Sequence, residues 1–139
     1  MACVLLGVSA AHKQFVLVRA MAPENLFISS TGVVKLANFE FSKSLLGGGV
    51  TMTVCGTPEY MPPEQLFGHG QDLTADAWVI GCLIYELLTG FTPFADPEGD
   101  FLRMQENVVK GMNADILDMI YNGVDSRTDD QANRGLAVE

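Results

Sequence analysis

Hydrophobic residues gather in two long runs along the chain, each of which predicts a helix. The run "AWVIGCLIYELL" over residues 77–88 is too short to cross a membrane, which takes roughly 20 residues, so it predicts a core helix. The opening "MACVLLGVSAA" resembles the apolar part of a signal peptide but has no basic residues before it. We therefore expect the last turns of a buried helix that ends near His12.

Shorter runs predict a hairpin and a long loop. In "LFISSTGVVKL", residues 26–36, two β-branched or aromatic stretches flank Ser30, Thr31 and Gly32, which is typical of a hairpin with a glycine-bearing turn. This is the only sheet that the sequence predicts. Glycine and proline interrupt residues 44–64 so often that we expect a long surface loop.

Capping residues predict the limits of the later helices. Thr74 precedes the core helix and Gly90 follows it. Asp100 is placed to cap a helix that Gly111 ends, within an acidic stretch, "ADPEGD", that we expect to be a solvated loop and cap. An amphipathic segment over 114–123 and a polar tail over 126–139 complete what we expect to be one domain.

Composition narrows the possible partners. The chain has 17 acidic and 8 basic residues and a formal net charge of −9, which argues against nucleic acid or an anionic membrane as a partner. Cys3, Cys55 and Cys82 are an odd number without zinc-ligand spacing, so we expect reduced, buried thiols in an intracellular compartment and no metal ion. His12 and His69 show no partner pattern.

The order of several motifs resembles the C-terminal lobe of a eukaryotic serine/threonine protein kinase. They are "H-x6-R-A-M-A-P-E-N", the hairpin, "N-F-E", "C-G-T-P-E-Y-M-P-P-E", "D-A-W-x-x-G" and "E-L-L-T-G-x-x-P-F". The stretches "TMTVCGTPEY" and "EFSKSL" most resemble the cyclic-nucleotide-dependent branch. The resemblance runs from about Leu5 to Gly135 and implies a mainly helical, partial kinase-like domain over 1–139.

The same resemblance implies that several working side chains are missing. Ala20 stands where the family has the aspartate that orients and deprotonates the substrate hydroxyl, and Ala22 stands where it has a phosphate-contacting lysine. Asn38 replaces the magnesium-binding aspartate, and Glu40 replaces the glycine that follows the phenylalanine. Of the metal ligands only Asn25 is retained, so we expect neither phosphotransfer nor a bound nucleotide, cofactor or metal.

The phosphate-binding loop and strand lysine of the family's N-terminal lobe have no counterpart before residue 12. Gly47, Gly48 and Gly49 follow the wrong element and open no helix, so we interpret them as a flexible loop and not as a phosphate cradle. The resemblance therefore covers the C-terminal lobe alone.

Scaffold residues of the family are retained. Asp76 resembles the buried aspartate that accepts N–H bonds from the catalytic loop, with Trp78 packed beside it. Glu64 resembles the glutamate that pairs with a distant arginine, here Arg134; the alternative is that both charges are solvated. Thr53 occupies a phosphorylation position near Arg19 and Lys43, or is an ordinary exposed threonine.

These observations favour a catalytically inactive pseudokinase fragment that binds another protein or belongs to a larger assembly. One alternative is a subunit of an ATP-dependent serine/threonine kinase whose N-terminal lobe is supplied elsewhere, and another is a decayed product without a role. Apolar side chains that would lie against the N-terminal lobe predict the partner surface: Leu26, Ile28, Phe39 and Phe41.

Overall fold

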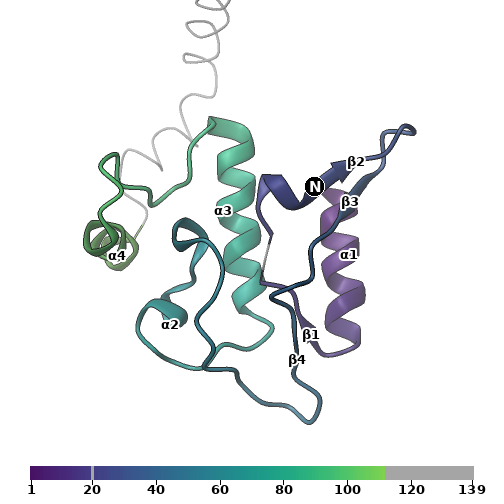
Figure 1. The fold of residues 1–139 in the computed structure, drawn as a ribbon, viewed down its shortest axis with the longest axis horizontal. Helices are drawn as coiled ribbons and strands as arrows, with labels where there is room; N and C mark the ends of the chain where they lie inside the picture. The colour runs from purple at the N-terminus through teal and green to yellow at the C-terminus, as the bar shows by residue number, and fades with distance from the viewer. Residues whose placement is uncertain (20, 112–139) are drawn as a thin grey trace, which may run out of the picture.

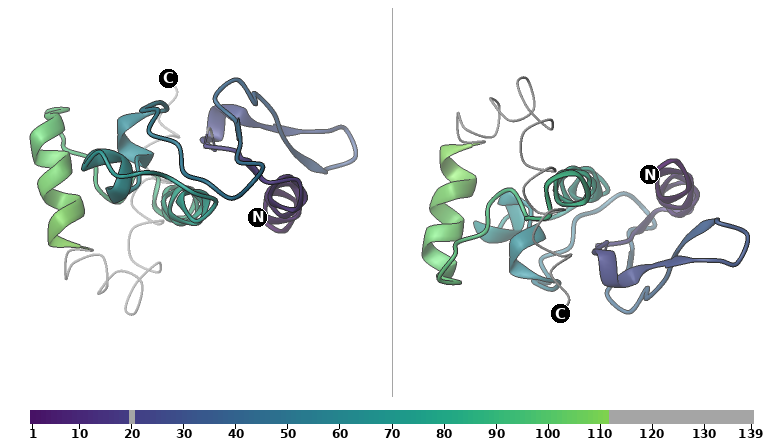
Figure 2. Two further views of the ribbon diagram at one scale, coloured as in Figure 1. Left: turned by 90° about the horizontal axis from the view of Figure 1, so that it is seen from below. Right: turned by 90° about the horizontal axis from the view of Figure 1, so that it is seen from above.

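The computed structural model describes residues 1–19 and 21–111. Helix α3, Ala75–Thr89, stands at the centre, with α1, Ala2–Lys13, on one side of it and α2, Pro63–Leu66, and α4, Phe101–Lys110, on the other (Figure 1). The views in Figure 2 show the same division. Short 3-10 turns, η1 and η2, span Pro23–Asn25 and Pro58–Tyr60.

Two small antiparallel sheets accompany the helices, whereas the sequence predicted one. Strands β2, Leu26–Ile28, and β3, Val34–Leu36, form the predicted hairpin, with Phe27 opposite Lys35. The second sheet joins β1, Val16–Leu17, to β4, Lys43–Ser44. Expecting the hairpin to be the only sheet was wrong, because strands of two residues are too short to show an alternating pattern.

Helix α1 is less buried than its apolar sequence suggests. Val4 and Val8 lie one turn apart on the face that enters the core, whereas Leu5 and Leu6 on the other faces are exposed among the described residues. Cys3 is also exposed, Cys55 is half-buried and Cys82 is buried, and all three are free thiols. The expectation of a fully buried helix and three buried thiols was therefore wrong. No helix in the described part of the chain is both long and apolar enough to cross a membrane.

The core helix has the predicted bounds, but its start is stabilised differently from the prediction. Thr74 is the N-cap residue without a capping side-chain bond; its hydroxyl and its N–H donate to the Asp72 carboxylate, at 2.5 and 2.7 Å. These two bonds lower the pKa of Asp72. At the other end Gly90 adopts the left-handed φ of 81° that favours glycine, and its N–H donates to the Glu86 carbonyl.

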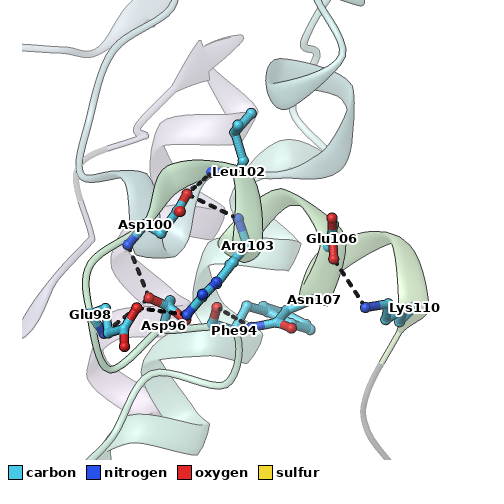
Figure 3. Close-up of polar contacts among 9 residues, drawn as sticks. All are labelled: Phe94, Asp96, Glu98, Asp100, Leu102, Arg103, Glu106, Asn107 and Lys110. Carbon is cyan, nitrogen blue, oxygen red and sulfur yellow. Dashed lines mark hydrogen bonds and ion pairs between the residues drawn. The ribbon is translucent and has the colours of Figure 1, made fainter.

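A capped, ion-paired loop leads into α4 (Figure 3). Asp100 accepts hydrogen bonds from the N–H groups of Leu102 and Arg103, at 2.8 and 3.3 Å, as its position predicted. The Asp96 side chain is largely buried, not solvated, and accepts from the N–H groups of Glu98 and Asp100. Residues 112–139, which include the predicted 114–123 segment, the polar tail and Arg134, lie outside the described residues.

Candidate functional site

A buried carboxylate organises the turn between β1 and η1. Asp76, at the start of α3, is fully buried and accepts N–H bonds from Val18 at 2.9 Å and Arg19 at 2.8 Å. Its Oδ2 also lies 2.7 Å from Nε2 of His12 at the end of α1. The resemblance implied that Asp76 accepts backbone N–H bonds, whereas the sequence showed no partner pattern for His12, because the pair is 64 residues apart and no local spacing signals it.

Arg19 connects this turn to the long loop. Its backbone is left-handed, with φ of 66°, and its side chain extends to carbonyls on two other segments. Nε donates to the Phe41 carbonyl at 2.7 Å and Nη1 donates to the Thr53 carbonyl at 3.3 Å. The buried Gln71 side chain donates to the same Thr53 carbonyl, and the backbones of Thr51 and Gln71 form a β-bridge. The loop is therefore anchored at residues 51 and 53.

The two asparagines that the resemblance places at metal-ligand positions contact each other. Asn38 Nδ2 donates to Asn25 Oδ1 at 3.2 Å, and Asn38 has a left-handed φ of 59° that asparagine tolerates well. Both groups are neutral, whereas magnesium in proteins is held through one or two carboxylates. This pair does not fit a magnesium ion, and the described residues contain no group of three His, Cys, Asp or Glu side chains suited to a metal.

A cleft of about 240 Å³ lies beside the asparagine pair. Its lining includes the buried methyl group of Ala22, where the resemblance implies a lysine, and Arg19 is the one cation among the described residues that line it. Its other lining residues are Met21, Asn25, Phe41, Gly56, Thr57 and Tyr60. Glu40 is exposed on the segment beyond Asn38, and Ala20 lies outside the described residues. Apart from Arg19, the described residues of the cleft wall are therefore neutral where phosphate chemistry calls for charged side chains.

Tyr60 attaches the loop to the core helix, which sequence reasoning missed. Its hydroxyl donates a hydrogen bond to the Glu86 carboxylate of α3. Burial, followed by the bond and charge of Glu86, raises the pKa of Tyr60 far above its ordinary value. The two partners are 26 positions apart in the sequence, and no local pattern reveals a pair at that separation.

The predicted phosphorylation site is open. Thr53 is exposed, and its hydroxyl accepts a hydrogen bond from the Thr51 hydroxyl at 3.3 Å. Arg19 contacts the carbonyl of the same residue. Lys43 is exposed on β4. The structure therefore brings Arg19 to Thr53, and it records no contact of Lys43 with that residue in the described part.

Two further scaffold predictions concern α2 and α3. Glu64 is half-buried on α2, and its predicted partner Arg134 lies outside the described residues. Trp78 stacks on Phe94 with ring centroids 5.0 Å apart, so the ring it packs against belongs to the segment after α3. Its indole N–H is buried and has no acceptor among the described residues.

The four residues of the predicted partner surface differ in exposure. Leu26 packs against the core from the inner face of the hairpin, so it does not belong to an open surface. Ile28 is 74% exposed, and Phe39 and Phe41 are 47% and 39% exposed. Phe27, which the sequence analysis did not select, is 58% exposed because it alternates with Leu26 along β2.

Comparisons with known proteins agree with the motif order. A family model described as "Protein kinase domain" matches residues 1–132. A cGMP-dependent protein kinase of Drosophila melanogaster, isozyme 2 forms cD5/T2, is 42% identical over 113 residues, which are 81% of this chain and 12% of that protein. The cGMP-dependent protein kinase egl-4 of Caenorhabditis elegans is 40% identical over 81% of this chain and 14% of its own length. Human cGMP-dependent protein kinase 2 is 43% identical over 68% of the chain and 12% of its own length.

Proposed function

Because the chain belongs to the protein kinase family, we propose that it is a kinase-domain portion that has lost phosphotransfer and acts by binding another protein. The loss of phosphotransfer is supported by the Asn25–Asn38 amide pair, at 3.2 Å, where the resemblance implies a metal site with a carboxylate. The chain spans about an eighth of the length of the cGMP-dependent kinases it matches, so their activity is not transferred to it directly.

Three separate requirements of phosphotransfer are affected. Ala20 offers no base for the substrate hydroxyl, and a missing general base alone costs roughly 10²- to 10⁴-fold in rate. Ala22 presents a methyl group to the cleft, and the Asn38 amide brings no negative charge to a metal. These losses act on the same transition state, which supports an inactive site.

A second candidate is part of an ATP-dependent serine/threonine kinase whose nucleotide-binding lobe comes from elsewhere. Its support is the 42% and 43% identity to proteins named cGMP-dependent protein kinases. A supplied lobe would leave Ala20, Ala22 and Asn38 unchanged, which is why we place this candidate second.

Phosphotransfer by the full chain separates the two candidates. We expect no transfer of radiolabelled phosphate from magnesium ATP to a mixed serine and threonine peptide library, either by the chain alone or with the N-terminal lobe of a cGMP-dependent kinase added. The matched variant restores three side chains, Ala20→Asp, Ala22→Lys and Asn38→Asp. Transfer by the unmodified chain that exceeds a heat-inactivated sample would overturn the proposal in favour of the second candidate.

The binding half of the proposal is supported by exposed apolar side chains. Ile28, Phe39 and Phe41 are exposed in the described structure, and large apolar side chains that gather into an exposed patch mark interaction sites. At roughly 25 cal/mol per Å², covering 400 Å² of such surface would contribute on the order of 10 kcal/mol before the costs of association. The proposed partner is another protein.

A further inference from the structure

The hairpin carries a cation, Lys35, that forms no ion pair with the described residues, and it also carries exposed apolar side chains. Phe27 and Lys35 are directly opposite each other in the β2–β3 register, so their side chains share one face. Both are exposed, and so is Val33, two residues before Lys35, at 46%; Ile28 alternates with Phe27, so it lies on the opposite face, where it is 74% exposed. We call these four residues, Phe27, Ile28, Val33 and Lys35, the hairpin surface.

Charge is divided unevenly along the chain. Residues 1–50 contain four Lys or Arg and two Glu, whereas residues 51–111 contain two Lys or Arg and nine Asp or Glu. α1 and the hairpin lie at one end of the molecule and α2 and α4 at the other, with α3 between them (Figure 2). The hairpin therefore lies at the basic end of an otherwise acidic protein.

The cations of the two ends also differ in their partners. Arg103 and Lys110 of α4 are paired with carboxylates, at 2.7 Å to Glu98 and 3.1 Å to Glu106 (Figure 3). Lys35 has no ion pair in the described part of the chain, and the segment from Leu26 to Leu36 contains no acidic residue. An incoming carboxylate would thus have no competitor within the hairpin.

The backbone of the hairpin favours an extended occupant. Among the described residues the sheet has two strands, and ladder bonds join Asn25 with Ala37 and Ser29 with Val33. Because bonded pairs alternate along an antiparallel ladder, the backbone groups of Ile28 point away from β3. An added strand could pair with this edge, as in other peptide complexes that extend a sheet.

We propose that the hairpin surface binds an extended, acidic segment of another protein, in which carboxylates alternate with apolar residues. Such a segment beside β2 would place its apolar residues on the face of Ile28 and its carboxylates on the face of Phe27 and Lys35. The added strand and β3 would be about 10 Å apart, within reach of a glutamate and a lysine side chain together. This inference rests on the proposed binding function and specifies its partner.

A short segment suits the charge distribution better than a second copy of the chain. At physiological ionic strength the Debye length is about 8 Å, so a segment lying on the hairpin is screened from the acidic end. A whole second copy would bring its own net charge of −9 against the first.

Fluorescence anisotropy with two labelled nine-residue peptides tests the inference on the full chain. We expect the peptide that alternates Glu with Leu to bind at least tenfold more tightly than the peptide that alternates Lys with Leu, and its binding to weaken as salt is raised. Lys35→Glu and Ile28→Ser should each weaken binding at least tenfold. The matched control Lys110→Glu, on the exposed surface of α4, should change it less than twofold.

Several results would overturn the inference. Equal binding of the two peptides, or unchanged binding by a Lys35→Glu variant whose circular dichroism and melting match the parent, would do so; Lys35→Gln provides a milder second variant. If the chain binds neither peptide but forms dimers in sedimentation that the hairpin variants abolish, the surface binds a second copy of the chain instead. Binding only to vesicles that contain phosphatidylserine would make a membrane the occupant. Phosphotransfer activity, measured separately, would remove the proposed inactivity and leave the peptide result standing.

Discussion

The carboxylate of Asp76 lies 2.7 Å from Nε2 of His12, across 64 residues of sequence. It also holds the N–H groups of Val18 and Arg19, so one fully buried side chain joins α1, the turn after β1 and α3. None of these contacts involves the side chains that the family resemblance assigns to phosphotransfer, so this part of the fold does not depend on them.

Replacing this carboxylate should destabilise the protein strongly. Asp76→Ala leaves two backbone N–H groups and the His12 ring without their acceptor, and we expect a loss of about 3 to 5 kcal/mol in the free energy of unfolding. Urea titration followed by circular dichroism measures it. His12→Ala, the matched control, removes one half-exposed donor and should cost about 1 kcal/mol. Equal losses in the two variants would contradict the central role of Asp76.

How much the sequence could predict depends on the range of the interaction. The bounds of α3, the hairpin and the Asp100 cap follow from patterns within one element, and the structure agrees with them. His12–Asp76, Tyr60–Glu86 and the β1–β4 sheet join distant residues, which single-sequence patterns do not encode. Only the resemblance to a family predicted that Asp76 is a buried acceptor of backbone N–H bonds. The same resemblance alone identified Ala22 and Asn38 as departures from the family pattern.

Stability should fall in alkaline solution because two buried groups resist ionisation. Burial raises the pKa of the Cys82 thiol to about 12, and burial with the Glu86 bond raises the pKa of Tyr60. A group whose pKa is raised in the folded state contributes fully to the free energy of unfolding below its unfolded-state pKa, which is near 9 for the thiol and 10 for the phenol. This contribution is lost as the pH rises above that value. We expect the free energy of unfolding, from urea titrations between pH 8 and 11, to decline above pH 9.

The variants Tyr60→Phe and Cys82→Ala test whether these two groups cause the decline in stability. Each variant is less stable than the parent at pH 8, because one loses the Glu86 bond and the other leaves a small cavity. Each should nevertheless lose less stability than the parent between pH 8 and pH 11, since it has one ionisable group fewer. A slope identical to that of the parent in both variants would show that other groups cause the decline.

A single carboxylate should restore some affinity for divalent cations. Asn38→Asp replaces the amide that donates to Asn25 with a charged oxygen ligand, leaving the Asn25 amide oxygen available beside it. We expect millimolar magnesium or manganese to raise the melting temperature of this variant and not that of the parent. Asn38→Gly is the control, because glycine adopts the φ of 59° freely and brings no ligand. A comparable shift in the parent would contradict our interpretation of the amide pair.

Phosphorylation of Thr53 should strengthen the contact between the long loop and Arg19. Nη1 of Arg19 already donates to the Thr53 carbonyl at 3.3 Å, and Nε is held by Phe41, so the guanidinium is positioned before any phosphate arrives. A phosphate would add one or more charge-assisted hydrogen bonds. Because Thr53 is exposed, screening limits the gain, and we expect about 1 kcal/mol in the free energy of unfolding.

A double-mutant cycle on chain prepared with phosphothreonine at residue 53 isolates this contact. The phosphate-dependent gain should disappear in Arg19→Met, shrink in Lys43→Met and persist in Lys110→Met, whose lysine is paired with Glu106 on α4. Raising the salt from 0.05 to 0.5 M should reduce the gain in the parent, since surface charges are screened. Arg19→Met also removes the bond to Phe41, so the quantity compared is the difference that phosphate makes within each variant. A gain that survives in Arg19→Met would mean that the phosphate is bound elsewhere and that Thr53 and Arg19 are neighbours without a regulatory connection.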